Sequence, residues 1–205
     1  MRRRVLTAVV VIGLGLGPAG CGGGEKREER AAAADPVVRA LREGGLTLVV
    51  RHAKAEGELG RPERLGSCAT QRMLTQAGRE QARQVGAGVR RLRVPIGEVR
   101  ASPLCRARDT ARLAFGRATI DRSLVSPGVV GTEADDRRRM KALRALAARP
   151  PDAGENRVLV THIGNIGGAF DATTMQEGET LVLGAGARVV GRVKAEDWAG
   201  LPGGG

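Results

Sequence analysis

The stretch that decides the fold is LTLVVRH, residues 46–52, in which five apolar or β-prone residues lead into Arg51 and His52. A second stretch of the same kind, RVLVTH, spans residues 157–162 and ends in His162. Short apolar runs bounded by loop signals predict buried strands. The carboxyl ends of parallel strands open onto the crevice where ligands bind. We therefore expect both histidines of the chain at the same edge of a sheet.

Helical and extended patterns alternate along the rest of the chain. Apolar residues recur at helical spacing over 75–92, with Thr75 as the expected N-cap. Ser102 is expected to cap a helix that starts at Pro103 and ends near Phe115. The other expected elements are a short helix through Val37, Val38 and Leu41, a strand at 98–101, a helix at 133–148, and a hairpin of 180–183 with 187–193. This order predicts an α/β fold: a three-layer α/β/α sandwich with a mainly parallel central sheet.

The first 21 residues have the pattern of an export signal. Arginines at 2–4 are followed by an apolar stretch, 5–17, and by small residues before Cys21. The apolar stretch is shorter than the roughly 20 residues that a membrane-spanning helix needs. Small residues directly before a cysteine resemble the lipobox of bacterial lipoproteins. We expect 1–21 to be a lipoprotein signal peptide, which would tether the protein to the membrane through Cys21 on the extracytoplasmic side; without lipidation the protein would be periplasmic or secreted.

The composition limits the kinds of binding partner that the chain can have. Residues 22–35, Gly-rich and then charged, predict a flexible tether before a domain at 36–202. The formal net charge is +12, which suits an anionic partner. The arginines are nevertheless spread over the whole chain, and only 1% of the residues are aromatic, so stacking groups for nucleic acid are missing. We interpret the charge as a compositional bias and expect no nucleic-acid partner.

Three cysteines are an odd number for an exported protein. Lipidation of Cys21 would leave Cys68 and Cys105, for which two alternatives stay open. They form a disulfide, which an oxidising compartment permits and which would contribute about 3–4 kcal/mol, or they are two buried thiols. Cys68 belongs to a polar loop of about twenty residues, 53–71, longer than a compact domain normally contains without a purpose.

Basic side chains gather at the predicted strand ends. Arg51 and His52 follow the first strand, His162 follows a later one, and Arg106 falls in the first turn of the helix after Ser102. Two guanidinium groups, two imidazoles and a helix N-terminus suit a dianionic phosphoryl group. Histidines without a carboxylate or cysteine at ligand spacing are poor zinc ligands, so no metal or other cofactor is expected.

Four segments resemble, in order, blocks of the histidine phosphatase superfamily, whose fold is phosphoglycerate-mutase-like. They are RHA at 51–53, LTxxGxxQA at 74–82, SPLxRAxxTA at 102–111 and VLVTH at 158–162. The resemblance implies that His52 attacks phosphorus and carries it as phosphohistidine, and that Arg51, Arg106 and His162 bind the phosphoryl oxygens. Attack requires a neutral imidazole, and the neighbouring arginines disfavour its protonation.

The resemblance also implies a carboxylic acid that protonates the leaving group. The candidates are Glu133, Asp135, Asp136 and Glu179. Asn165 is a candidate for orienting phosphate, with helix capping as the alternative. The expected function is hydrolysis of a phosphomonoester, either a phosphorylated small molecule or a surface substrate. The alternative is a catalytically weak phosphate- or anion-binding lipoprotein that retains the pocket.

Overall fold

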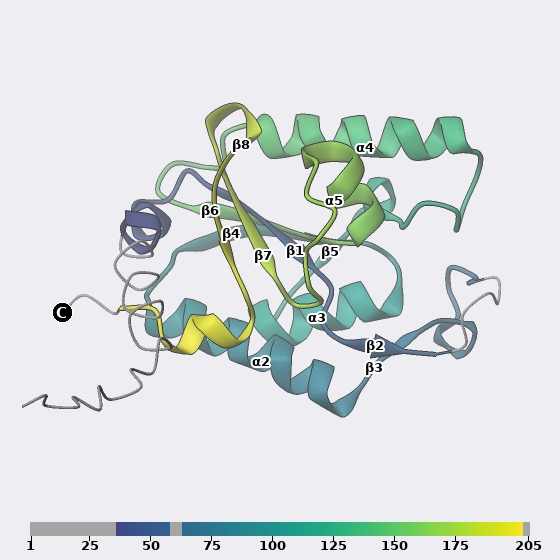
Figure 1. Ribbon diagram of the computed structural model, residues 1–205, viewed down its shortest axis with the longest axis horizontal. Coiled ribbons are helices and arrows are strands. Elements are labelled where there is room, and N and C mark those ends of the chain that lie inside the picture. Colours follow the sequence, from purple (N-terminus) through teal and green to yellow (C-terminus); the bar gives the residue numbers. More distant parts are fainter. Residues whose placement is uncertain (1–35, 58–62, 203–205) are drawn as a thin grey trace, which may run out of the picture.

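The computed structural model describes residues 36–57 and 63–202. The expected signal peptide (1–21), tether (22–35) and lipidation site Cys21 lie outside the described residues. The centre of the fold is a six-stranded sheet with the strand order β5-β4-β6-β1-β7-β8 (Figure 1). Its strands are β1 (Thr47–Arg51), β4 (Ile96–Ala101), β5 (Thr119–Ile120), β6 (Asn156–Thr161), β7 (Thr180–Gly184) and β8 (Arg188–Val193). The first four are mutually parallel and the last two form an antiparallel hairpin, so the sheet is mainly parallel, as predicted.

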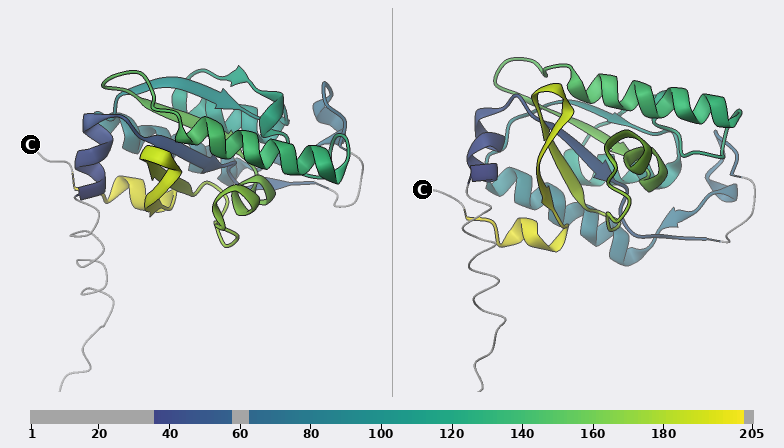
Figure 2. Two further views of the ribbon diagram at one scale, coloured as in Figure 1. Left: turned by 90° about the horizontal axis from the view of Figure 1, so that it is seen from above. Right: turned by 45° about the horizontal axis from the view of Figure 1, so that its top comes forward.

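Helices cover both faces of this sheet and complete three layers (Figure 2). On one face lie α2 (Gln76–Arg91) and α3 (Cys105–Phe115), and on the other lie α4 (Glu133–Ala148) and α5 (Ile163–Phe170). Val50 belongs to the apolar core on the α2 and α3 side, whereas Val49 belongs to the core on the α4 and α5 side. Successive strand residues point to opposite faces of the sheet. Because β1 is buried on both faces, its sequence is a continuous apolar run.

The pairing of β1 with β6 sets the position of both histidines. These neighbouring parallel strands are in register, with Arg51 opposite Thr161. The backbone N–H of His52 donates to the carbonyl oxygen of Thr161 at 3.0 Å, which extends the ladder by one residue. His52 and His162 therefore leave the sheet at the same edge, as the sequence predicts.

Tertiary contacts hold the described part of the loop between β1 and α2. Two short strands, β2 (Ala55–Glu56) and β3 (Met73–Leu74), pair within it. A disulfide joins Cys68 to Cys105 at the start of α3, with their Cα atoms 5.8 Å apart. Of the two alternatives for these cysteines, the structure contains the bridge. It attaches the loop to the helix that supplies Arg106.

The start of α3 differs from the prediction. The helix begins at Cys105 with Leu104 as its cap residue, so Pro103 lies outside the helix and Ser102 is not the cap. The backbone N–H of Cys105 is bound instead by the side-chain oxygen of Gln71, at 2.7 Å. Gln71 comes from the loop attached by the disulfide, so this contact depends on tertiary structure and has no local signal. At α2, Thr75 is the N-cap as predicted, and its hydroxyl accepts from the N–H of Gly78.

Helix α5 was not predicted, because the segment after His162 is rich in glycine and glycine disfavours helices. The glycines allow a close approach to neighbouring elements. A Cβ atom on Gly168 would lie 2.2 Å from the sulfur of Met140 in α4, and one on Gly164 would lie 2.9 Å from the ring of Pro127. Packing against α4 therefore outweighs local propensity. In the described part of the chain, no helix is long and apolar enough to cross a membrane.

Replacing both bridged cysteines by serine (Cys68→Ser with Cys105→Ser) is expected to lower the free energy of unfolding by about 3–4 kcal/mol. The bond links residues 37 positions apart and so restricts the unfolded chain. Urea unfolding of oxidised wild type, reduced wild type and the double variant measures this difference. Reduced wild type should resemble the variant, and equal stability of the oxidised protein and the variant would contradict the expectation.

Candidate active site

His52 is buried immediately after β1, with 3% of its surface exposed. Its Nδ1 lies 2.9 Å from the carbonyl oxygen of Ala53, and its Nε2 accepts a hydrogen bond from Nε of Arg106 at 3.3 Å. The proton is therefore on Nδ1 and the lone pair is on Nε2, because the partner of one ring nitrogen sets the tautomer. A lone pair on an oriented, unprotonated nitrogen is what a nucleophilic imidazole requires.

Electrostatics keeps this imidazole neutral. Burial lowers the pKa of His52 to about 3, the positive charges of Arg106, Arg51 and Arg72 act in the same direction, and the hydrogen bond to Ala53 opposes them. Burial also lowers the pKa of His162 well below its ordinary value, with His52 and Arg106 as the next causes. Both rings are therefore uncharged at neutral pH.

His162 lies beside His52, with 5.2 Å between the ring centroids and a tilt of 54°. Its Nε2 is 2.9 Å from the hydroxyl of Ser102. Its Nδ1 is buried and has no hydrogen-bond partner among the described residues. Buried polar atoms normally have a partner, so a free imidazole nitrogen at this place is available to an oxygen atom of a ligand.

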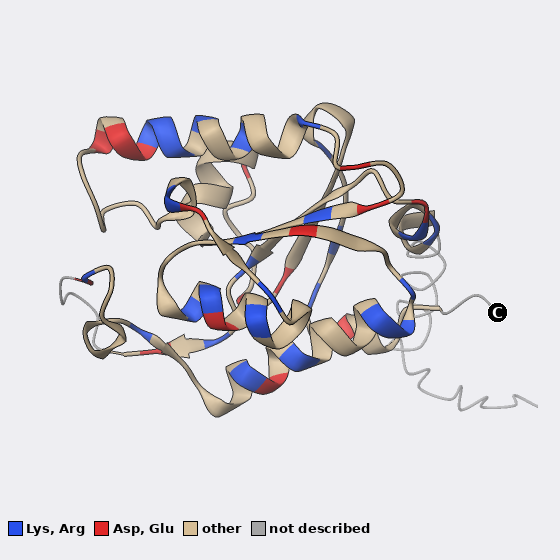
Figure 3. Ribbon diagram, turned by 180° about the vertical axis from the view of Figure 1, so that it is seen from behind, with Lys and Arg blue, Asp and Glu red and all other residues tan. Residues whose placement is uncertain are grey.

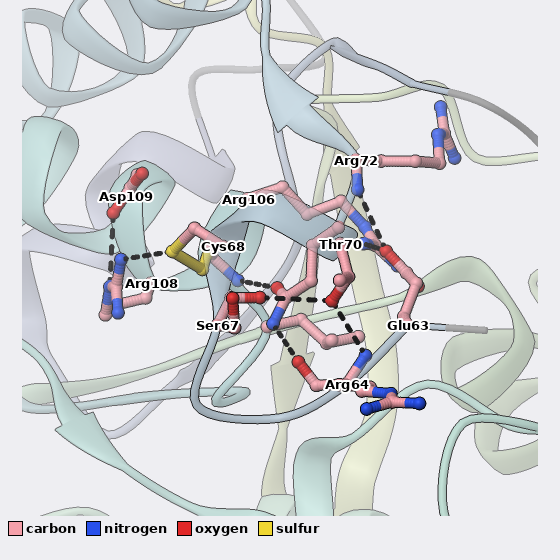
Figure 4. Close-up of a disulfide and its surroundings, with 12 residues drawn as sticks. Glu63, Arg64, Ser67, Cys68, Thr70, Arg72, Arg106, Arg108 and Asp109 are labelled. Atoms are coloured by element: carbon pink, nitrogen blue, oxygen red, sulfur yellow. Dashed lines mark hydrogen bonds and ion pairs between the residues drawn. A yellow bond between two sulfur atoms is a disulfide. The ribbon is translucent and has the colours of Figure 1, made fainter. Parts of the chain in front are cut away.

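Arg106 projects from the first turn of α3 and is 4% exposed. One edge of its guanidinium, at Nε, faces His52. Its terminal nitrogens Nη1 and Nη2 bind the two carboxylate oxygens of Glu63 at 2.5 and 3.0 Å (Figure 4). Glu63 belongs to the loop attached by the disulfide and was not among the predicted site residues.

Two further arginines surround His52. Arg51, predicted from the sequence, donates from Nη1 to the carbonyl oxygen of Met175 at 2.5 Å. Arg72 was not predicted; its guanidinium donates to the carbonyl oxygen of Ala55. Their Nη2 atoms lie 3.9 Å and 3.5 Å, respectively, from the same carboxylate oxygen of Glu177. The site therefore contains three guanidinium groups, where the sequence predicted two.

The structure does not bring the predicted proton donors to His52. The Glu133 side chain is 93% exposed and pairs with Arg137 along α4. Asp135 completes the capping box of that helix, and Asp136 in the same turn binds the N–H of Gly128 and pairs with Arg139. The carboxylate of Glu179 accepts from the N–H of Gln176 and from Arg192.

The side chain of Asn165 is also bound to groups outside the site around His52. Its amide nitrogen donates to the carbonyl oxygens of Leu124 and Val125 and lies 3.0 Å from the hydroxyl of Thr161. Only this nitrogen could donate to a phosphate oxygen, and its hydrogens are already bound. The residue therefore fixes the chain at 124–125 against α5 and does not line the group around His52.

Arg72, Glu63 and Glu177 were missed because nothing in their local sequence marks them. The only signals were indirect: the unusual length of the loop 53–71, its cysteine, and the Gly-Glu turn directly after Glu177. Over the described elements, Lys and Arg lie on α2, α3 and α4 with acidic residues interspersed (Figure 3). No group of three His, Cys, Asp or Glu side chains in residues 36–57 and 63–202 could hold a metal ion.

Comparison with known proteins shows which family and which solved structures this chain resembles. The family model described as "Histidine phosphatase superfamily (branch 1)" matches residues 47–126, from β1 past α3. A structure of the protein histidine phosphatase SixA complexed with tungstate superposes with a TM-score of 0.54 at 16% identity, covering 74% of this chain and 98% of that one. Phosphoglycerate mutase from Thermus thermophilus gives 0.51 at 20% identity, covering 72% and 98%. No curated protein matches the chain in sequence.

The fold is thus that of phosphatase- and mutase-like enzymes, an α/β sheet with its site at the carboxyl ends of the strands. Over residues 47–126 the chain matches the histidine phosphatase superfamily, and its fold resembles those of these two solved structures. The matched segment contains Arg51, His52 and Arg106, whereas His162 lies outside it.

The buried imidazole makes stability depend on pH. The pKa of His52 is about 3 in the folded protein against 6.5 in the unfolded chain, so the unfolded chain binds more protons between these values. The free energy of unfolding should therefore fall as the pH falls from 6.5 towards 3, and His52 should account for about 2 kcal/mol between pH 7 and 5. Urea unfolding of wild type and His52→Gln at both pH values tests this. An equal loss in both proteins would contradict it.

Proposed function

We propose that this protein is a phosphomonoester hydrolase that works through a phosphohistidine intermediate on His52. The observation that carries the proposal is the state of that ring: buried, neutral, and with the lone pair of Nε2 directed at the Nε edge of Arg106. The unpartnered Nδ1 of His162 and the guanidinium of Arg106 offer donors for phosphoryl oxygens beside it.

In the first step, Nε2 of His52 forms a bond to phosphorus and the ester P–O bond breaks. Charge on the phosphoryl oxygens is stabilised by Arg106, Arg51 and Arg72, whose positive charges all act on His52. In the second step, a water oxygen attacks phosphorus, the N–P bond breaks, and inorganic phosphate and neutral His52 are released. The arginines serve both steps, because both pass through the same phosphoryl group.

One observation favours the alternative function, an anion-binding protein with weak catalysis. Arg106 is already paired with Glu63, which offsets part of its charge, and Glu133, Asp135 and Glu179 all have other partners. Such a protein would bind phosphate at the same residues and would not form phosphohistidine. The two functions therefore differ in turnover and in the intermediate.

We further propose that the enzyme acts outside the cytoplasm, tethered to the membrane through a lipid on Cys21 or else released into the periplasm. Support comes from the charged and apolar pattern before Cys21 and from the Cys68–Cys105 disulfide, because such bonds persist in oxidising compartments. A phosphorylated small molecule or a surface phosphate group would then be the substrate. No nucleic acid is part of the proposal.

Hydrolysis of p-nitrophenyl phosphate tests the reaction. His52→Ala should lower kcat by at least about 10³-fold, because it removes the nucleophile. Arg112→Ala changes an exposed residue on the same helix as Arg106 and should leave kcat unchanged. Quenching in alkaline denaturant with labelled substrate should trap an acid-labile, base-stable phosphoryl group on wild type only. Phosphate binding without turnover in wild type would support the alternative, and unchanged activity in His52→Ala would remove the nucleophile.

Fractionation of bacterial cells tests the tether. The full-length wild-type chain should be recovered with the membranes, and Cys21→Ala should be released into the soluble extracytoplasmic fraction, because only the acyl chains anchor the protein. Membrane recovery of both proteins, without a lipid mass on Cys21, would contradict lipidation.

A further inference from the structure

The proposed reaction needs a proton for the leaving group, and the acids predicted from the sequence do not supply it. Glu133 pairs with Arg137 on the exposed side of α4, and Glu179 is bound by Arg192 and by a backbone N–H. An alkoxide is a poor leaving group, so a positioned acid contributes typically 10²–10⁴-fold to such a step. Another carboxyl group must provide the proton.

Two carboxylates approach different sides of the His52 ring: Glu177 lies near Nδ1, and Glu63 binds Arg106, which faces Nε2. Glu177 is 3.9 Å from Nδ1, the nitrogen whose proton is bound to Ala53. Attack occurs at Nε2, and the leaving group departs in line on the far side of phosphorus. Glu177 therefore lies at the ring nitrogen that does not attack, and its carboxylate lies near Arg51 and Arg72.

Glu63 lies on the reacting side. It binds Nη1 and Nη2 of Arg106, whose Nε lies 3.3 Å from Nε2 of His52. A guanidinium has five N–H donors arranged along different edges. The edge that contains Nε faces His52, and a phosphoryl group bonded to Nε2 would take the place of that hydrogen bond, while the end of the guanidinium stays on Glu63. Substrate and Glu63 can thus occupy Arg106 together, side by side.

The loop that carries Glu63 is fastened to the same helix as Arg106. The backbone N–H of Arg72 donates to the Glu63 carboxylate at 3.0 Å (Figure 4). The Cys68–Cys105 disulfide joins the loop to the residue before Arg106, and Gln71 binds the N–H of Cys105. The carboxylate is 15% exposed. Its position relative to Arg106 is therefore part of the fold.

We propose that Glu63 is the proton donor of this enzyme, a role that rests on the proposed function. As Nε2 of His52 bonds to phosphorus and the ester P–O bond breaks, the carboxyl proton of Glu63 passes to the departing oxygen, which leaves as an alcohol. The Glu63 carboxylate then takes a proton from the water that attacks phosphohistidine. Protons and bonds balance over the two steps, and the net consumption is one water.

The charge around Glu63 suits this exchange. In the resting protein, burial raises the pKa of Glu63, but the hydrogen bonds and charges of Arg106 and Arg72 outweigh burial, and the net pKa is lowered. A phosphoryl dianion on the same guanidinium adds negative charge beside the carboxylate, which raises its pKa and favours the protonated acid. The proton that a monoanionic ester brings with it can then reside on Glu63.

The test is the dependence of kcat/KM on the leaving group in Glu63→Gln, which keeps the size of the side chain and an oxygen acceptor for Arg106. With phenyl phosphate and a simple alkyl phosphate, kcat/KM should fall by about 10²–10⁴-fold. With p-nitrophenyl phosphate, whose leaving group needs no proton, it should change by no more than about threefold. Glu56→Gln, an exposed glutamate on β2, should match wild type throughout. Glu177→Gln should show no dependence of its effect on the leaving group.

Other outcomes overturn the proposal. An equal loss with all three substrates would make Glu63 a positioning residue for Arg106. Faster turnover together with tighter binding of inorganic phosphate would make it a competitor for the phosphate position. Failure of wild type to hydrolyse any of the three esters, with no phosphohistidine, would overturn the proposed function itself. Each of these results is distinct from the selective loss that supports proton donation.

Discussion

The parallel pairing of β1 with β6 is the contact on which the rest of the site depends. Because Arg51 lies opposite Thr161, the next residue of each strand is a histidine, and the two rings come within 5.2 Å. A shift of one residue would turn one of these side chains to the other face of the sheet. Burial on both faces, by Val49 on one side and Val50 on the other, holds the register.

Beside the two histidines, Arg106 connects the imidazole of His52 to the loop between β1 and α2. Its guanidinium faces His52 at one edge and Glu63 at the other. Burial and positive charge keep His52 neutral, and the same positive charge suits an anionic ligand. The Cys68–Cys105 disulfide fastens both partners of the Glu63–Arg106 pair to one helix end. The proposed nucleophile, phosphate ligand and proton donor are thereby linked through the side chain of Arg106.

Local patterns were sufficient for much of the framework. The strands that end in Arg51 and in Thr161, helix 76–91 with its Thr75 cap, and the hairpin of β7 with β8 follow from hydrophobic periodicity and turn residues. Helix α5 was missed because three glycines disfavour a helix locally, and its contact with Met140 appears only when α4 is in place. The cap of α3 by Gln71 was missed for the same reason, since its donor and acceptor are 34 residues apart.

By itself, the sequence determined which strands carry the histidines and that Arg51 and Arg106 belong near them, because these residues follow directly from short-range pattern and motif. Only the tertiary structure decided which carboxylates surround the site. Glu63, Glu177 and Arg72 come from loops without periodicity, and their positions depend on a disulfide and on contacts between distant segments. Charge near an active site is a property of distances through space, which spacing along the chain does not encode.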